Sequence, residues 1–184
     1  PQVFRAGDPV DRDQEAFVFR SAVVDDIERQ VMLSTGCPSL ILYGRRRTGK
    51  TTIIRNLKGF LPSDITTVDI SMQNPEASIS MPDFIDTLIR EISNLIPGIS
   101  LEKSKDLKTL FKFLSVCNDT LKKRSHRLLL IIDEYEILDK KMGQNIFSLD
   151  LLDTIRESIQ KHRQMTWIFC GSHEIHELSH ASWT

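Results

Sequence analysis

Gly44-Arg45-Arg46-Arg47-Thr48-Gly49-Lys50-Thr51 is the stretch that decides the fold of this 184-residue chain. It matches G-x-x-x-x-G-K-[ST] at every fixed position, follows the apolar run 40–43 and leads into a helical pattern over 52–57. The glycines let the backbone turn its N–H groups toward an anion, and the N-terminus of the following helix adds partial positive charge. The stretch therefore predicts a phosphate-binding loop between a strand and a helix.

The loop pattern assigns roles to its residues. Lys50 can reach the β- and γ-phosphates of a nucleotide, and the Thr51 hydroxyl can hold Mg²⁺. The residues expected to contact the nucleotide are Gly44, Arg45, Arg46, Arg47, Thr48, Gly49, Lys50, Thr51 and Thr52. The three arginines could instead suggest nucleic acid, but they occupy the variable positions of the loop, which favours a solvated or nucleotide-adjacent role.

A second motif lies downstream, where the apolar run 128–132 ends in Asp133-Glu134. An unbroken apolar run predicts a strand buried on both faces of a parallel sheet, and ligands bind at the carboxyl end of such strands. We expect Asp133 to hold Mg²⁺ and Glu134 to polarise a water for attack on the γ-phosphate. A buried strand that merely ends in polar residues is the alternative, and the Lys-Thr loop upstream argues against it.

Strand and helix patterns alternate along the chain. Residues 65–70 alternate as a strand, 80–83 resemble a capping box ahead of a helix, and 165–170 predict the last strand. The predicted order is strand, helix, strand, two helices, strand, helix and strand, which implies a parallel sheet with helices on both faces. We expect the fold class to be α/β, a P-loop NTPase core over 36–184 that follows a leader and helix over 1–35.

Ser172 follows the last predicted strand. We expect that strand to lie beside the phosphate-loop strand, so that Ser172 comes near the γ-phosphate. Its hydroxyl could hold the attacking water or sense the phosphate, and an ordinary loop serine is an equal alternative. Ser172 therefore joins Glu134 and Lys50 as a candidate catalytic residue.

Composition narrows the possible partners. Hydrophobic residues make up 40% of the chain and charged residues 27%, with a net charge of −1, so the overall balance favours neither nucleic acid nor membrane. Cys37, Cys117 and Cys170 are widely spaced, which indicates reduced thiols and a cytoplasmic location. His176-Glu177-Leu178-Ser179-His180 matches a zinc-protease pattern, but none of the four residues after His180 is a possible third ligand.

The loop with Tyr43 before it resembles that of the prokaryotic STAND ATPases and the related archaeal ATPase family, within the AAA-like group. Asp133-Glu134 matches the Walker B motif of that family. Phe17-Val18-Phe19-Arg20 is similar to its Phe-x-Gly-Arg box, although Phe19 stands where glycine is usual. The resemblance implies that Val18, Phe19 and Arg20 lie against the adenine, and that the cofactors are ATP and Mg²⁺.

The resemblance also implies a function. Members of the family are nucleotide-controlled switches, in which ADP holds a closed monomer and ATP with a trigger favours self-association. Many serve in signalling or phage defence. We expect such a switch here, triggered by an unknown protein or nucleic acid and without a membrane. The family's fold adds a fifth strand, a helical lid and a winged helix beyond the fourth strand, so we expect this chain to be a fragment.

Two other functions stay open. One is a DNA-associated ATPase, such as an initiator, loader or motor, which ATPase stimulation by DNA would reveal. The other is a scaffold that binds ATP without hydrolysing it, against which the intact Glu134 argues. A GTPase is disfavoured because neither Asn-Lys-x-Asp nor Thr-Lys-x-Asp occurs.

Overall fold

The computed structural model describes residues 21–33, 39–44, 49–99 and 105–172. In chain order its elements are α1 (Ser21–Leu33), β1 (Ser39–Tyr43), α2 (Lys50–Leu57), β2 (Ile65–Ser71), α3 (Pro75–Ser78), α4 (Met81–Leu95), α5 (Leu107–Lys123), β3 (Arg127–Asp133), α6 (Tyr135–Gly143), α7 (Asp150–Lys161) and β4 (Met165–Gly171). Among these described residues, no helix is long and apolar enough to cross a membrane.

The four strands form one parallel sheet in the order β1-β4-β3-β2. The last strand in sequence is thus inserted between the phosphate-loop strand β1 and the Asp133 strand β3. In register, Gly171 lies opposite Tyr43 on one side, and Cys170 lies opposite Asp133 on the other. This arrangement confirms the predicted α/β class and the parallel-sheet core of a P-loop NTPase, and it confirms that β4 lies beside β1.

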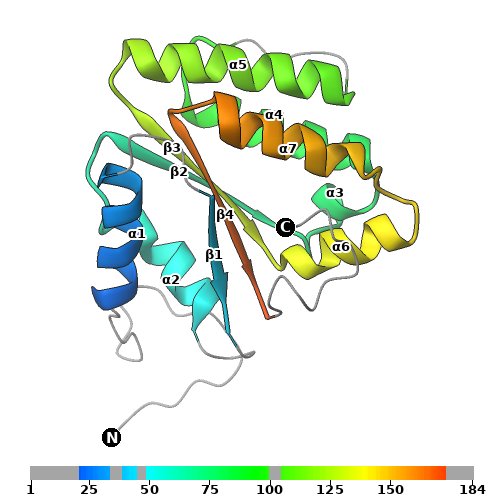
Figure 1. Ribbon diagram of the computed structural model, residues 1–184, viewed down its shortest axis with the longest axis horizontal. Coiled ribbons are helices and arrows are strands. Elements are labelled where there is room, and N and C mark those ends of the chain that lie inside the picture. The colour runs from blue at the N-terminus through cyan, green and yellow to red at the C-terminus, as the bar shows by residue number, and fades with distance from the viewer. Residues whose placement is uncertain (1–20, 34–38, 45–48, 100–104, 173–184) are drawn as a thin grey trace, which may run out of the picture.

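Helices cover both faces of the sheet (Figure 1). Successive side chains of a strand point to opposite faces, so one strand serves two apolar clusters. In β3, Leu128, Leu130 and Ile132 pack on the side of α4, α5, α6 and α7, whereas Leu129 and Ile131 pack on the side of α1 and α2. This double burial explains why 128–132 is a continuous apolar run.

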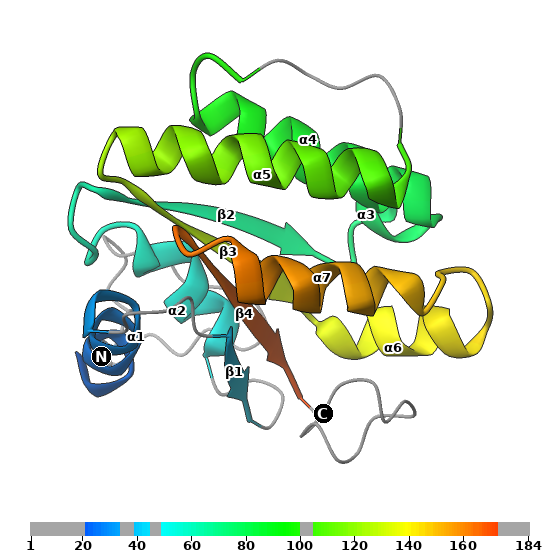
Figure 2. The same cartoon turned by 45° about the horizontal axis from the view of Figure 1, so that its top comes forward.

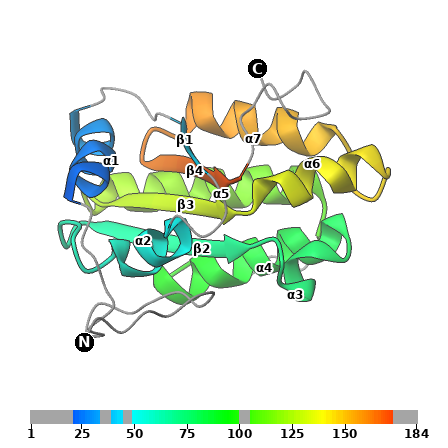
Figure 3. The ribbon, with the colours of Figure 1, turned by 90° about the horizontal axis from the view of Figure 1, so that it is seen from below.

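The larger cluster lies under α3, α4, α5, α6 and α7, and α5 contacts both α4 and α7 (Figure 2). On the opposite face, Val24 and Ile27 of α1 pack in the same cluster as Ile54 and Leu57 of α2. Figure 3 looks onto the face that these two helices cover. Because α2 packs against the sheet through its buried residues, the position of its N-terminus, and hence of Lys50 and Thr51, is set relative to the strand ends.

The predicted order of elements lacked two helices, α3 and α6. The helix α3 has four residues and is too short to show a periodic pattern; the Asn74 side chain caps it by accepting from the Glu76 N–H. The helix α6 begins directly after the strand motif Asp133-Glu134, within a short interval between two longer elements. By contrast, the predicted cap at Ser80 is confirmed, since its hydroxyl oxygen accepts from the Asp83 N–H at 3.3 Å.

Candidate functional site

The carboxyl ends of β1, β4 and β3 lie at the same edge of the parallel sheet as the N-terminus of α2, and Thr51 of α2 contacts Asp133 of β3 there. Of the predicted loop residues, the structure describes Gly44, Gly49, Lys50, Thr51 and Thr52. Arg45, Arg46, Arg47 and Thr48, and the predicted adenine contacts Val18, Phe19 and Arg20, lie outside the described residues. The HExxH segment 176–180 does so as well.

Gly49 closes the loop in a left-handed conformation, with φ 86° and ψ 16°, directly before the first residue of α2. That conformation is the reason a glycine is required at this position. The Gly49 carbonyl accepts the first helical hydrogen bond, from Ile53 N–H at 3.0 Å. The Lys50 ammonium reaches back and donates to the Gly44 carbonyl, so it spans the two ends of the loop. A cation at this point is placed to meet an anion held by the loop.

Thr51 and Asp133 converge from α2 and β3. The Thr51 hydroxyl donates to Asp133 Oδ2 at 3.2 Å, while Asp133 Oδ1 accepts from the Glu134 N–H at 3.0 Å. Asp133 is only 6% exposed, so its carboxylate is held on both sides in a largely water-free position. Neighbouring oxygen ligands of an octahedral Mg²⁺ lie about 3 Å apart, since each sits at about 2.1 Å from the ion. The Thr51–Asp133 pair therefore fits the oxygen donors that Mg²⁺ requires.

Glu134 has a backbone conformation that ordinary residues avoid, with φ 58° and ψ 47°. A left-handed non-glycine residue costs about 1–3 kcal/mol and tends to occur at functional sites. This turn lets α6 start immediately after β3, and it leaves the Glu134 side chain half-buried at the strand edge. The Gln73 side-chain amide donates to Glu134 Oε1. Gln73, which lies just after β2, therefore holds the Glu134 side chain at the end of β3.

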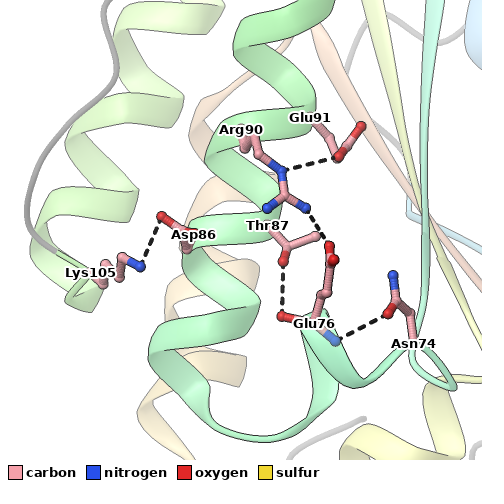
Figure 4. A network of polar contacts seen from close by, with 7 residues as sticks. All are labelled: Asn74, Glu76, Asp86, Thr87, Arg90, Glu91 and Lys105. Carbon is pink, nitrogen blue, oxygen red and sulfur yellow. Dashed lines mark hydrogen bonds and ion pairs between the residues drawn. The ribbon is translucent and has the colours of Figure 1, made fainter.

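A polar network holds the segment that carries Gln73 (Figure 4). Immediately after Gln73, Asn74 caps α3, and the Thr87 hydroxyl of α4 donates to the Glu76 carbonyl at 3.0 Å. The Arg90 guanidinium of α4 also pairs with the Glu76 carboxylate at 2.9 Å. The short helix α3 is therefore fastened to α4, and Gln73 is placed against Glu134 by this packing.

Two further groups adjoin Asp133 on the α2 side of the sheet. Burial and the neighbouring Asp133 carboxylate raise the pKa of Asp69, on β2, to about 6, against a smaller opposing effect of Arg55. The Asp69 side chain is nevertheless exposed to solvent, and screening by solvent makes this rise of its pKa smaller. The pKa of the Cys170 thiol is raised well above its ordinary value; burial is the largest cause, and the Asp133 carboxylate is the next. Cys170 therefore stays protonated and is a packing residue beside Asp133.

Ser172 is held by Glu136 of α6. Glu136 Oε1 accepts from the Ser172 hydroxyl at 2.6 Å and from the Ser172 N–H at 3.3 Å. Next to it, Gly171 packs so closely against α6 that an added Cβ would overlap Glu136 Oε2 and lie 2.7 Å from the Tyr135 ring. The first turn of α6 therefore fits onto the end of β4 because residue 171 has no side chain.

The structure brings Lys50, Thr51, Asp133, Glu134 and Ser172 to the same edge of the sheet. Sequence reasoning missed Gln73 and Glu136, which contact Glu134 and Ser172. Gln73 could have been found, since it too follows a strand that ends at this edge. Within the described part of the chain, no three His, Cys, Asp or Glu side chains gather as a metal cluster.

The family model described as an AAA domain matches residues 33–178. No curated protein matches the chain. Among solved structures, the Walker-type ATPase paby2304 of Pyrococcus abyssi is similar, with a TM-score of 0.62 and 19% identity over 86% of this chain and 46% of that one. The ORC2 protein of Aeropyrum pernix, in its ADPNP-ADP complexes, has a TM-score of 0.58 and 16% identity over 83% of this chain and 40% of that one.

At these identities the two structures support the fold alone. The chain spans less than half the length of each of them. The match to the family model covers β1 to β4, and so includes the loop, the Asp133 strand and Ser172.

Proposed function

Because the chain belongs to the AAA domain family, we propose that it is the core of a Mg²⁺-dependent ATPase. The observation that carries this proposal is the convergence of Lys50, Thr51, Asp133 and Glu134, from two elements far apart in sequence, at one edge of the sheet. A scaffold that only binds ATP would need the first three of these residues but not a carboxylate at position 134 held in a strained conformation.

Different residues of the chain would bind the phosphates, activate the attacking water and hold the metal ion. The loop N–H groups and Lys50 bind and orient the phosphates, and Lys50 exchanges its contact with the Gly44 carbonyl for one with a phosphate oxygen. Glu134 accepts a proton from the water that attacks the γ-phosphate. The Gln73 amide orients the Glu134 carboxylate for that step. Thr51 and Asp133 would hold Mg²⁺, which when bound supplies charge neutralisation at the phosphate oxygens.

The metal assignment predicts a specific binding defect. We expect wild-type protein to bind a fluorescent ATP analogue more tightly with Mg²⁺ than with EDTA. Asp133→Ala should lose most of this difference, because it removes the carboxylate that holds Thr51 and would hold the ion. Asp153→Ala, an exposed carboxylate of α7, is the control and should behave as wild type. An undiminished Mg²⁺ effect in Asp133→Ala would contradict the metal assignment.

The proposal extends to a switch like those of the STAND ATPases, with a cytoplasmic location and a role in signalling or phage defence. Its support is the motif resemblance, together with Cys117 and Cys170, which are free and buried. An ATPase changes its partners only if its ATP and ADP forms differ in the free energy of assembly. The γ-phosphate is the chemical difference between the two nucleotides, so Glu134, Ser172 and Thr51 are the residues that would report it.

The switch predicts a change in mass. We expect the whole protein carrying Glu134→Gln, trapped with ATP, to form a larger assembly than the ADP-bound wild type. Light scattering after size exclusion, in the presence of the physiological trigger, measures both. Equal masses for the trapped ATP form and the ADP form would reject the switch and leave an ATPase that does not assemble in response to nucleotide.

A further inference from the structure

The edge of the sheet opposite the phosphate loop is built from three short segments that lead out of helices and into strands. The Arg127 N–H donates to the Asp64 carbonyl at 2.9 Å, which joins the second segment to the first. The Leu128 N–H donates to the Gln164 carbonyl at 2.9 Å, which joins the second to the third. These segments, called the basic edge below, are 58–64 between α2 and β2, 122–127 between α5 and β3, and 161–164 between α7 and β4. Figures 1 and 2 show α5 and α7 ending where β3 and β4 begin.

The basic edge concentrates positive charge that the net charge of −1 conceals. Asp64 is its only acidic residue. The side chains of Lys122, Lys123 and Arg163 are exposed and make no ion pair with any described residue. The lysines and arginines of the basic edge are Lys58, Lys122, Lys123, Arg124, Arg127, Lys161 and Arg163.

Part of this charge has a structural explanation. The carboxyl end of a helix carries about half a negative charge, which favours Lys and Arg in the last turn. The ends of α2, α5 and α7 together therefore offset about 1.5 positive charges. Lys161 also pairs with Glu157, and the Arg124 guanidinium donates to the Pro97 carbonyl at 2.7 Å. A surplus of positive charge remains, and it is repulsive unless an anionic partner neutralises it.

We propose that the basic edge binds the phosphate backbone of a nucleic acid duplex without reading its base sequence. A duplex carries one negative charge for about every 1.7 Å of its length, so it matches a surface of repeated cations better than a single phosphate group does. Side chains between the cations fit the same partner. Ser63 and Ser125 are exposed and Gln164 is half-buried, and hydroxyl and amide groups commonly hydrogen-bond phosphate oxygens.

Two other anionic partners fit the basic edge less well. A protein surface that lies in a membrane interface presents apolar side chains beside its cations, and within these three fully described segments no large hydrophobic residue is exposed. Single-stranded nucleic acid is bound largely by stacking of bases on aromatic rings. Phe60, the only Phe, Tyr or Trp in the basic edge, packs instead against the apolar cluster under α1 and α2.

The basic edge is distant from the proposed nucleotide site. Strand β3 runs from Arg127 at the basic edge to Asp133 at the nucleotide site, and at about 3.3 Å per residue it separates them by about 20 Å. A duplex and a nucleotide can therefore be bound at the same time. The inference goes beyond the proposed ATPase function and does not rest on it.

Fluorescence anisotropy of the whole protein with labelled short duplexes, measured without nucleotide at about 50 to 200 mM salt, tests the inference. The probes are DNA and RNA duplexes, each in two unrelated sequences. We expect binding that is independent of sequence and weakens as salt rises. Each cation that contacts a phosphate contributes about 0.9 to the slope of log K against log salt. At about 50 mM salt, Arg163→Ala should thus weaken binding roughly 10-fold, and Lys122→Ala with Lys123→Ala roughly 100-fold.

The matched control is Lys108→Ala with Lys140→Ala, which removes two exposed lysines from the first turn of α5 and from α6 and should bind as wild type does. Melting curves should be alike, since all the replaced side chains are exposed, and Arg163→Ala stands as a separate test if the lysine variant is unfolded. Wild-type protein that binds neither duplex, basic-edge variants with the affinity and salt slope of wild type, or an equal loss in the control would overturn the inference. Tighter binding to vesicles of anionic phospholipid than to either duplex would also overturn it and assign the basic edge to a membrane surface.

Discussion

Glu134→Gln is expected to bind ATP as wild type does and to hydrolyse it about 10²–10⁴-fold more slowly, the usual cost of losing a positioned general base. Gln keeps the size of the side chain and an oxygen that can accept from the Gln73 amide, so the local packing should survive. What it loses is the capacity to take a proton from water. The expected result is therefore a change in kcat with little change in nucleotide affinity.

Phosphate release under saturating Mg²⁺-ATP, paired with titration of a labelled ATP analogue, measures both properties on the same preparation. Glu157→Gln on α7 makes the identical chemical change far from the sheet edge and should leave both values as they are. Equal turnover in Glu134→Gln and wild type would mean that another group is the base, and it would contradict the assignment of Glu134 as the general base.

Lys50→Ala has the second-largest expected effect, and it falls on binding. Hydrogen bonds to charged groups are worth about 1.5–3 kcal/mol, which corresponds to roughly a 10- to 150-fold weaker affinity for ATP. The Lys50 side chain contacts the Gly44 carbonyl across the loop, and the core residues of α2 are Ile54 and Leu57, one to two turns away. The substitution should therefore leave the fold intact.

The same helix provides the control. Lys58 is exposed at the C-terminal end of α2, so Lys58→Ala removes an equal charge from the end that faces away from the loop. Titration with a labelled ATP analogue should show weak binding by Lys50→Ala and ordinary binding by Lys58→Ala. An affinity of Lys50→Ala that equals that of wild type, in a protein shown to be folded, would contradict the assignment of the phosphate loop.

The parts of the fold that could be predicted are those with a local cause. The apolar run 128–132 is continuous because β3 is buried on both faces, and Gly49 is required because its backbone is left-handed. The neighbouring placement of β1 and β4 also followed from the motif order and is confirmed. The first two features depend on the chemistry of a few adjacent residues, whereas the strand pairing follows from the order of the elements along the chain.

The parts that could not be predicted depend on partners far apart in the chain. Gln73 meets Glu134 only because β2 and β3 end at the same edge, and Glu136 meets Ser172 only because α6 packs on β4. The left-handed turn at Glu134 has no local sequence requirement, since the surrounding packing imposes it. The assignment of Lys50, Thr51, Asp133, Glu134 and Ser172 to catalysis and binding remains a prediction until nucleotide is added.

The central claim is that this edge of the sheet both binds and hydrolyses ATP. The most direct test is to incubate the whole protein with a known amount of Mg²⁺-ATP and to count the inorganic phosphate released for each bound nucleotide. The account predicts repeated turnover, with more than one phosphate per binding site and no release when EDTA replaces Mg²⁺. Tight, stoichiometric ATP binding without phosphate release, under the same conditions and with the trigger present, would contradict it and identify a scaffold that binds ATP without hydrolysing it.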